Sequence, residues 1–120
     1  MKQNYQNLIV WQKSMNLVVE VYKLTSNYPT SELYGLTSQS RRCSVSIPSN
    51  IAEGARRNGN NEFVHFLYIA FGSGAELETQ IEIAKRLPFG KNLDFSVVEN
   101  LLEEIMKMLN TLITKRSNRT

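Results

Sequence analysis

Residues 61–87 read NEFVHFLYIAFGSGAELETQIEIAKRL, and this stretch decides the fold. Apolar and small side chains recur in it every three or four residues, which places them in one continuous arc at about 100° per residue. The members of this arc are Phe63, Phe66, Leu67, Ala70, Gly74, Leu77, Ile81 and Ala84. The spacing predicts a long amphipathic helix that ends before Pro88, with Ile69, Ile83 and Leu87 outside its core-facing arc.

Three further segments show the same periodicity, and we expect helices at residues 8–28, 33–58 and 95–116. Pro48 lies inside the second of them. Because the apolar row stays in phase on both sides of it, we expect one helix kinked at the proline, with two helices meeting there as the alternative. Ser96 and Glu99 match a capping box at the start of the last helix. Four helices, short connections and no strand-like alternation predict an all-α, up-down-up-down antiparallel four-helix bundle, with residues 1–120 forming a single domain.

The first helical segment carries two adjacent apolar rows. One row is Leu8, Trp11, Met15, Val18, Tyr22 and Thr25, and the other is Leu17, Val21, Leu24 and Tyr28. A monomeric bundle needs one buried stripe on each helix, so the surplus apolar surface predicts self-association. The alternative is a wide core face or ordinary scattered surface hydrophobes.

The composition is that of a globular protein. Hydrophobic residues make up 42% and charged residues 21% of the chain, which excludes an intrinsically disordered or collagen-like protein. Cys43 is the only cysteine, so no internal disulfide can form and a reducing compartment is expected. Leu8-Ile9-Val10 is too short for the apolar region of a signal peptide, and the apolar run 66–71 is too short to cross a membrane. We therefore expect a cytoplasmic protein with no membrane partner.

Residues that could carry catalysis are sparse. His65 is the only histidine, and Glu62 precedes it in a Glu-x-x-His pattern of the kind found in di-iron bundles. Such a site needs two of these motifs and two further glutamates, whereas this chain has one motif and places it away from the core arc. We interpret Glu62 and His65 as helix-surface residues. The sequence predicts a protein that is not an enzyme, with no catalytic, cofactor-binding or metal site and no evident small-molecule substrate.

Eight of the 14 basic residues form four adjacent pairs, and two of these pairs lie in the second helix. Residues 41–57 contain four arginines and one acid, Glu53, so their net charge of +3 equals that of the whole chain. The guanidinium group is a planar, bidentate donor that suits phosphate. We predict an RNA- or DNA-binding face built from Arg41, Arg42, Arg56, Arg57, Lys115 and Arg116.

Two alternatives to this binding face remain open. The arginines can be an ordinary solvated face, with Arg57 paired to Glu53, or they can pair with carboxylates of a neighbouring subunit. Neither a recognition helix nor an exposed aromatic platform is evident in the sequence.

The stretch YGLTSQSRRCSVSIPSNIAEG, residues 34–54, is distinctive. Together with VWQK (10–13), VYKLT (21–25), FLYIA (66–70) and AELETQ (75–80), it strongly resembles the bacterial four-helix-bundle proteins encoded in intervening sequences of 23S rRNA genes. The resemblance covers about residues 8–87. It implies a four-helix fold, a homo-oligomeric ring, expected to be a pentamer, and a positively charged surface.

The resemblance implies no established biochemical activity. A related accessory protein of diversity-generating retroelements is similar in fold and is thought to contact nucleic acid and a reverse transcriptase. Four positions depart from the family's usual pattern: Ser40 replaces an aliphatic residue, Cys43 and Ser44 replace alanines, and Gly74 replaces a larger apolar residue. We expect these departures to alter local packing of the second and third helices rather than the fold.

Overall fold

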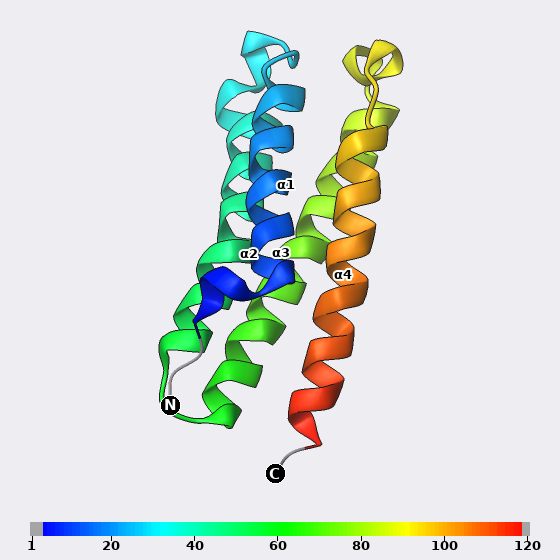
Figure 1. Cartoon of the computed structure of the whole chain (residues 1–120). Helices are drawn as coiled ribbons and strands as arrows, with labels where there is room; N and C mark the ends of the chain where they lie inside the picture. The colour runs from blue at the N-terminus through cyan, green and yellow to red at the C-terminus, as the bar shows by residue number, and fades with distance from the viewer. Residues whose placement is uncertain (1–3, 119–120) are drawn as a thin grey trace.

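The computed structural model describes residues 4–118, and within that range it is built from helices without strands. Four long helices follow one another: α1 (Ile9–Thr25), α2 (Ser38–Arg56), α3 (Asn60–Arg86) and α4 (Ser96–Ser117). Successive helices run in opposite directions and form an elongated bundle of 48 × 20 × 20 Å (Figure 1). The predicted all-α class and four-helix architecture are confirmed.

Short helical turns connect the long helices. A 3-10 turn, η1 (Tyr5–Asn7), precedes α1, and η2 (Thr30–Glu32) and η3 (Leu33–Thr37) lie between α1 and α2. The turn η4 (Pro88–Asn92) separates α3 from α4. Helix α1 ends three residues before the predicted boundary, because the chain closes into turns in which Tyr28 N–H donates to the Thr25 carbonyl.

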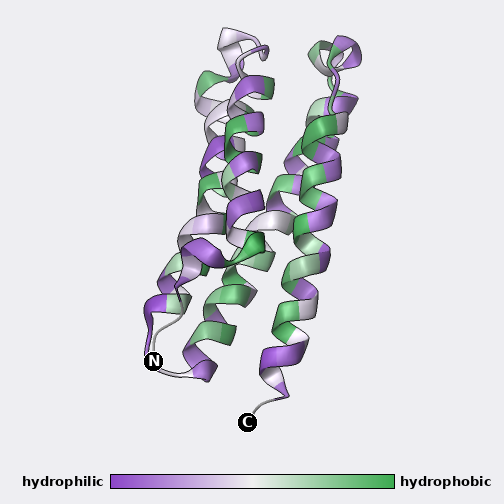
Figure 2. Cartoon of the chain, viewed as in Figure 1, coloured by the Kyte–Doolittle hydropathy of each residue, from purple (hydrophilic) through white to green (hydrophobic). Residues whose placement is uncertain are grey.

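The core is a continuous apolar column to which every long helix contributes. Its most deeply buried apolar side chains are Leu17, Val21, Ile47, Ile51, Leu67, Leu77, Leu102, Ile105 and Leu109. Hydrophobic and hydrophilic residues alternate along each helix, as amphipathic helices require (Figure 2). The arc predicted for α3 is in the core or beside it, while Ile69 and Ile83 are exposed as expected.

The row of Leu17, Val21, Leu24 and Tyr28 is buried throughout, whereas the other row meets the core mainly at its ends, through Leu8, Trp11 and Thr25. Leu17, Val21 and Leu24 are buried, whereas Met15 and Tyr22 each expose 43% of their surface. The buried row also includes Ser14, whose hydroxyl donates to the Trp11 carbonyl at 2.8 Å and is thereby satisfied inside the core. The surplus apolar surface expected on α1 is therefore present on the outside of the bundle.

Helix α2 continues through Pro48 as one element. The proline is buried, and its missing N–H leaves the carbonyl of Ser44 without its usual helical donor. The expected single helix is found, and two separate helices meeting at Pro48 are not. The kink at this position stays a prediction.

The capping box predicted at the start of α4 is wrong. Ser96 is the first residue of the helix, and its backbone N–H donates to Asp94 Oδ1 at 2.9 Å. Glu99 does not turn back to the helix start, because its carboxylate accepts a hydrogen bond from Lys85 Nζ at 2.8 Å. The hydrogen bond from Ser96 also lowers the pKa of Asp94, so Asp94 caps this helix as a carboxylate.

Two glycines allow α3 to approach its neighbours closely. A Cβ built on Gly54 of α2 would lie 2.6 Å from Phe66 Cβ, which no real structure tolerates. A Cβ built on Gly74 of α3 would overlap the sulfur of Met106 on α4. Gly72 lies two residues before Gly74 on the same helix, and a Cβ built on it would meet no atom of another helix within 4 Å.

Candidate nucleic-acid interface

Arg41 lies in the first turn of α2, at the end of the bundle where the chain passes from α1 to α2. Its Nε donates a 2.9 Å hydrogen bond to Thr25 Oγ1, and its guanidinium carbon is 4.5 Å from the centroid of the Tyr22 ring. Both contacts are made with α1, so the side chain is held in one place from two directions. The hydrogen bond to Thr25 uses Nε, so the terminal NH1 and NH2 groups are the ones that a phosphate would approach.

Arg42 points to solvent beside this anchored arginine. It is exposed and makes no ion pair with any other residue between 4 and 118. A cavity of about 340 Å³ adjoins both arginines and is also lined by Tyr22, Ser38 and Val45. This end of the bundle thus combines two guanidinium groups with a half-exposed aromatic ring.

Arg56 and Arg57 lie at the other end of α2, about 22 Å farther along the helix axis. The Arg56 guanidinium is 5.4 Å from the centroid of the Tyr5 ring and is exposed. Arg57 is paired: its NH2 is 2.7 Å from Glu53 Oε2, and its NH1 is 4.0 Å from Glu62. The six predicted residues are therefore divided between two ends of the molecule, and the charge of Arg57 is partly compensated.

The C-terminal turns of α4 lie at the same end of the bundle as Arg56 and Arg57 (Figure 1). Asn60, the first residue of α3, donates from Nδ2 to the Arg116 carbonyl at 2.7 Å and so fixes the end of α4 beside the α2–α3 turn. The Arg116 guanidinium is 5.0 Å from the centroid of the Phe63 ring. Lys115 is exposed on the same turn. We call Arg56, Arg57, Lys115 and Arg116 the basic end of the bundle.

The pairing of arginines with aromatic rings was not predicted from the sequence. Arg41, Arg56, Arg57 and Arg116 each have a guanidinium over an aromatic ring, on Tyr22, Tyr5, Phe66 and Phe63 respectively. No exposed aromatic platform is evident in the sequence, but individual rings are exposed in the structure: Tyr34 exposes 92% and Tyr68 57% of its surface. Nothing in the sequence gives the relative register of α1, α2 and α4 that creates these pairs.

An acidic groove lies between α3 and α4, toward the end of the bundle away from Lys115. Its cavity is about 310 Å³ and is lined by Glu78, Glu82, Glu99 and Glu103. Of these, Glu99 is paired with Lys85. Positive and negative charge are thus separated along the long axis of α4.

A sequence model of the 23S rRNA-intervening sequence proteins matches residues 6–111, nearly the whole chain. The chain belongs to the 23S rRNA-intervening sequence protein family. A crystal structure of a protein of unknown function of the S23 ribosomal protein family, from Bacteroides thetaiotaomicron VPI-5482, superposes with a TM-score of 0.77 at 26% sequence identity. The alignment covers 88% of this chain and 98% of the other. No curated protein matches the chain.

The four positions at which we expect departures from the family pattern, Ser40, Cys43, Ser44 and Gly74, are all buried. Ser44 is fully buried and donates to the Arg41 carbonyl at 2.8 Å, while Ser40 is buried with an oxygen that has no partner in the described part of the chain. The room that a larger residue would fill at Gly74 is occupied by Met106. Cys43 is a free thiol whose pKa is raised by burial, and Gln80 Nε2 lies 3.5 Å from its sulfur.

The described residues contain neither a cluster of metal-binding side chains nor a helix that could span a membrane. Between residues 4 and 118 no three metal-binding side chains converge, and His65 is an exposed residue whose ring packs edge-on against Phe66. In the same range, no helix is both long enough and apolar enough to span a bilayer. The chemistry that this surface offers is ionic and aromatic.

Proposed function

We propose that this protein is a non-enzymatic, homo-oligomeric four-helix bundle that binds the phosphate backbone of RNA or DNA in the cytoplasm. The observation that carries the proposal is the gathering of Arg56, Arg57, Lys115 and Arg116 at the basic end, from two helices that are far apart in the sequence. Glu53 and Glu62 form salt bridges with Arg57 there. A local excess of cations is what non-specific phosphate binding needs.

The arginine–aromatic pairs favour this function over a merely solvated face. A guanidinium held over a ring by a cation–π contact can still donate its N–H groups to a phosphate. Such an arginine loses little side-chain freedom on binding, because the ring already restricts it.

Self-association is the second part of the proposal. Met15, Val19 and Tyr22 follow one another at helical spacing on α1 and expose between 43% and 53% of their surfaces. Burying this row against another copy would remove apolar area from water. The family resemblance favours a pentamer, and a ring would place several basic ends on one assembly and raise its avidity. Light scattering of the purified protein tests this part: a strict monomer would refute it.

Charge reversal tests nucleic-acid binding. Arg56→Glu combined with Lys115→Glu should lower the affinity for a fluorescent single-stranded oligonucleotide by at least about tenfold at low salt, because each phosphate contact contributes to the electrostatic term. Arg86→Glu reverses an exposed charge at the opposite end of α3 and serves as the matched control. Equal affinity of the folded double variant and the control would contradict the proposal.

A protein–protein scaffold is the alternative function, and the acidic groove favours it. The bundle has an acidic groove at one end, with Glu78, Glu82 and Glu103, and the basic end at the other. Such a charge distribution suits electrostatic pairing with a second protein or subunit. Absence of binding to any RNA or DNA at low salt, together with a stable oligomer, would favour this alternative.

A further inference from the structure

Helix α1 is too short to cover the whole length of α4. It has 17 residues, whereas α3 has 27 and α4 has 22, so α1 begins beside the middle of α4 (Figure 1). Upstream of Ile9 the chain does not continue along α4, because it turns toward α2, where Tyr5 lies under Arg56. The C-terminal half of α4 is therefore left without its α1 neighbour.

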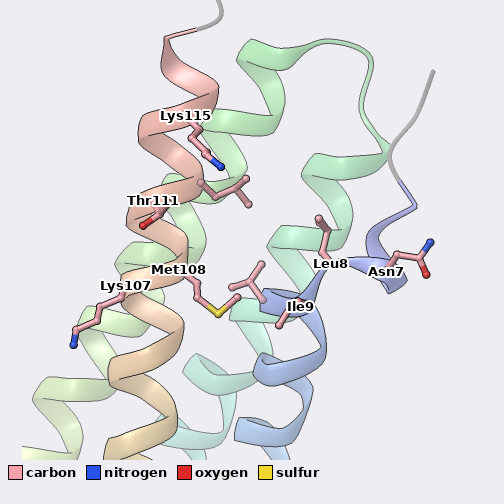
Figure 3. Close-up of a pocket in the computed structure, with 9 residues that line it drawn as sticks. Asn7, Leu8, Ile9, Lys107, Met108, Thr111 and Lys115 are labelled. Carbon is pink, nitrogen blue, oxygen red and sulfur yellow. The ribbon is translucent and has the colours of Figure 1, made fainter.

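A groove of about 500 Å³ follows from this difference in length. Its walls are the start of α1, with Leu8 and Ile9, and the face of α4 that carries Met108 and Leu112. Ile9 exposes 57% of its surface, and the side chains of Ile9 and Met108 point toward one another across the opening (Figure 3). The volume lies in the range of small-molecule sites.

One cation marks the end of this apolar groove. The ammonium group of Lys115 points toward the opening, while Lys107 and the hydroxyl of Thr111 point away from it (Figure 3). Lys115 makes no ion pair with any other residue from 4 to 118. From Met108 to Lys115 the groove runs about 10 Å along α4. An apolar channel with a single unpaired cation at one end matches a molecule with an apolar body and one anionic group.

We propose that this groove binds an acyl-chain monocarboxylate, free in solution. The acyl chain lies against Leu8, Ile9, Met108 and Leu112, and the carboxylate pairs with Lys115. A second copy of the chain fits less well, because the groove is short. Its one inward-pointing cation, Lys115, also matches a single anionic group at one end of a ligand. Lys115 belongs to both surfaces, so a carboxylate bound in the groove and a phosphate bound at the basic end would compete for its ammonium group.

The test uses protein labelled with 13C at its methionine methyl groups and two probes of the same chain length, decanoate and decyltrimethylammonium, kept below their micelle concentrations. Decanoate should shift the Met108 signal saturably and leave that of Met15, an exposed methionine on α1, unchanged. Decanoate should bind about fivefold more tightly than the cation, which is the size of one exposed ion pair. Lys115→Gln should remove that difference, and Lys107→Gln, the matched control, should keep it.

Other outcomes would overturn the proposal. Equal shifts at Met108 and Met15 would indicate non-specific apolar adsorption, and equal affinities for the two probes would remove the role of Lys115. If Met108 does not respond and Ile9→Gln lowers the oligomer mass in light scattering, the groove is a contact between copies. Binding only to vesicles of anionic phospholipid would make it a membrane contact. Because no nucleic acid is present, failure here leaves the phosphate-binding proposal standing.

Discussion

Arg41 Nε donates a 2.9 Å hydrogen bond to Thr25 Oγ1, and this bond joins α2 to α1. Thr25 is buried and its hydroxyl in turn donates to the Val21 carbonyl at 2.7 Å, so a single hydroxyl links the backbone of α1 to a cation on α2. One of the arginines assigned to phosphate binding is therefore also part of the packing between two helices.

This bond predicts energetic coupling between the two residues. Thr25→Val and Arg41→Ala should each lower the free energy of unfolding, and the double variant should lose about 1 kcal/mol less than the sum of the single losses. Urea denaturation of the four proteins in the cycle measures the coupling. Strict additivity would show that the hydrogen bond contributes nothing to stability.

Glu53 is predicted to weaken nucleic-acid binding at the basic end. Its carboxylate is 2.7 Å from Arg57 and holds the pKa of that guanidinium above its ordinary value. Glu53→Gln removes this competitor for the guanidinium and one negative charge, so oligonucleotide affinity should rise about two- to threefold at low salt. Glu103→Gln, an exposed change in the acidic groove, is the control. A fall in affinity on Glu53→Gln would mean that Glu53 positions Arg57 for binding.

Gly54 and Gly72 make a matched pair for the packing of α3. Gly54→Ala should cost about 2 kcal/mol of stability, because its Cβ would collide with Phe66 Cβ, an atom held by the backbone of α3. Gly72→Ala should stabilise the protein by about 0.5–1 kcal/mol, because it removes backbone freedom from an exposed helical site with open space around it. Thermal unfolding of both variants compares them, and equal effects would contradict the close approach of α2 and α3.

Tyr28 predicts a loss of stability at alkaline pH. It is 7% exposed, its ring centroid is 4.9 Å from that of Phe89, and its hydroxyl has no partner among the described residues. Burial raises its pKa from 10.0 to about 12. Between these two values the unfolded chain releases the proton while the folded chain keeps it, so stability is complete below the lower value and falls as pH rises.

The measurement is urea unfolding at about pH 9 and about pH 11, where the loss attributable to Tyr28 should be about 1 kcal/mol. Tyr28→Phe keeps the ring against Phe89 and removes the titrating group, so its stability should fall less over the same interval. The same pH dependence in both proteins would assign the loss to other groups.

The fold was predictable because the apolar period of the long helices is unambiguous. Leu67, Leu77 and Ile81 on α3 recur at helical spacing and are buried as that spacing requires. On α1 the periodicity gave two rows, and the sequence could not say which row is buried. Ser14 extends the buried row although it is polar, because its hydroxyl bonds to a carbonyl of its own helix. Asp94 was not predicted as a capping residue, because the capping-box pattern begins at Ser96, two residues later. The Asp94 side chain accepts a hydrogen bond from the backbone N–H of Ser96.

The candidate site was predictable only as a set of charges. Composition located the arginines, but helix packing decides which neighbours each one has. Arg41 meets Tyr22 of α1, and Arg116 meets Phe63 of α3, across helix pairs whose register no local pattern encodes. The separation of Arg42 from Arg56 along α2 follows from the helical rise and could have been anticipated. The position of Arg116 beside Asn60, at the start of α3, could not.

The salt dependence of oligonucleotide binding tests the central claim most directly. Fluorescence anisotropy of a labelled single strand, repeated over a series of salt concentrations, gives the slope of log affinity against log salt. If the exposed cations contact three or four phosphates, the slope should be about −2 to −3, and Arg56→Glu with Lys115→Glu should make it shallower by at least about 1. An affinity that does not change with salt, or a slope that the double variant leaves intact, would contradict phosphate binding at the basic end.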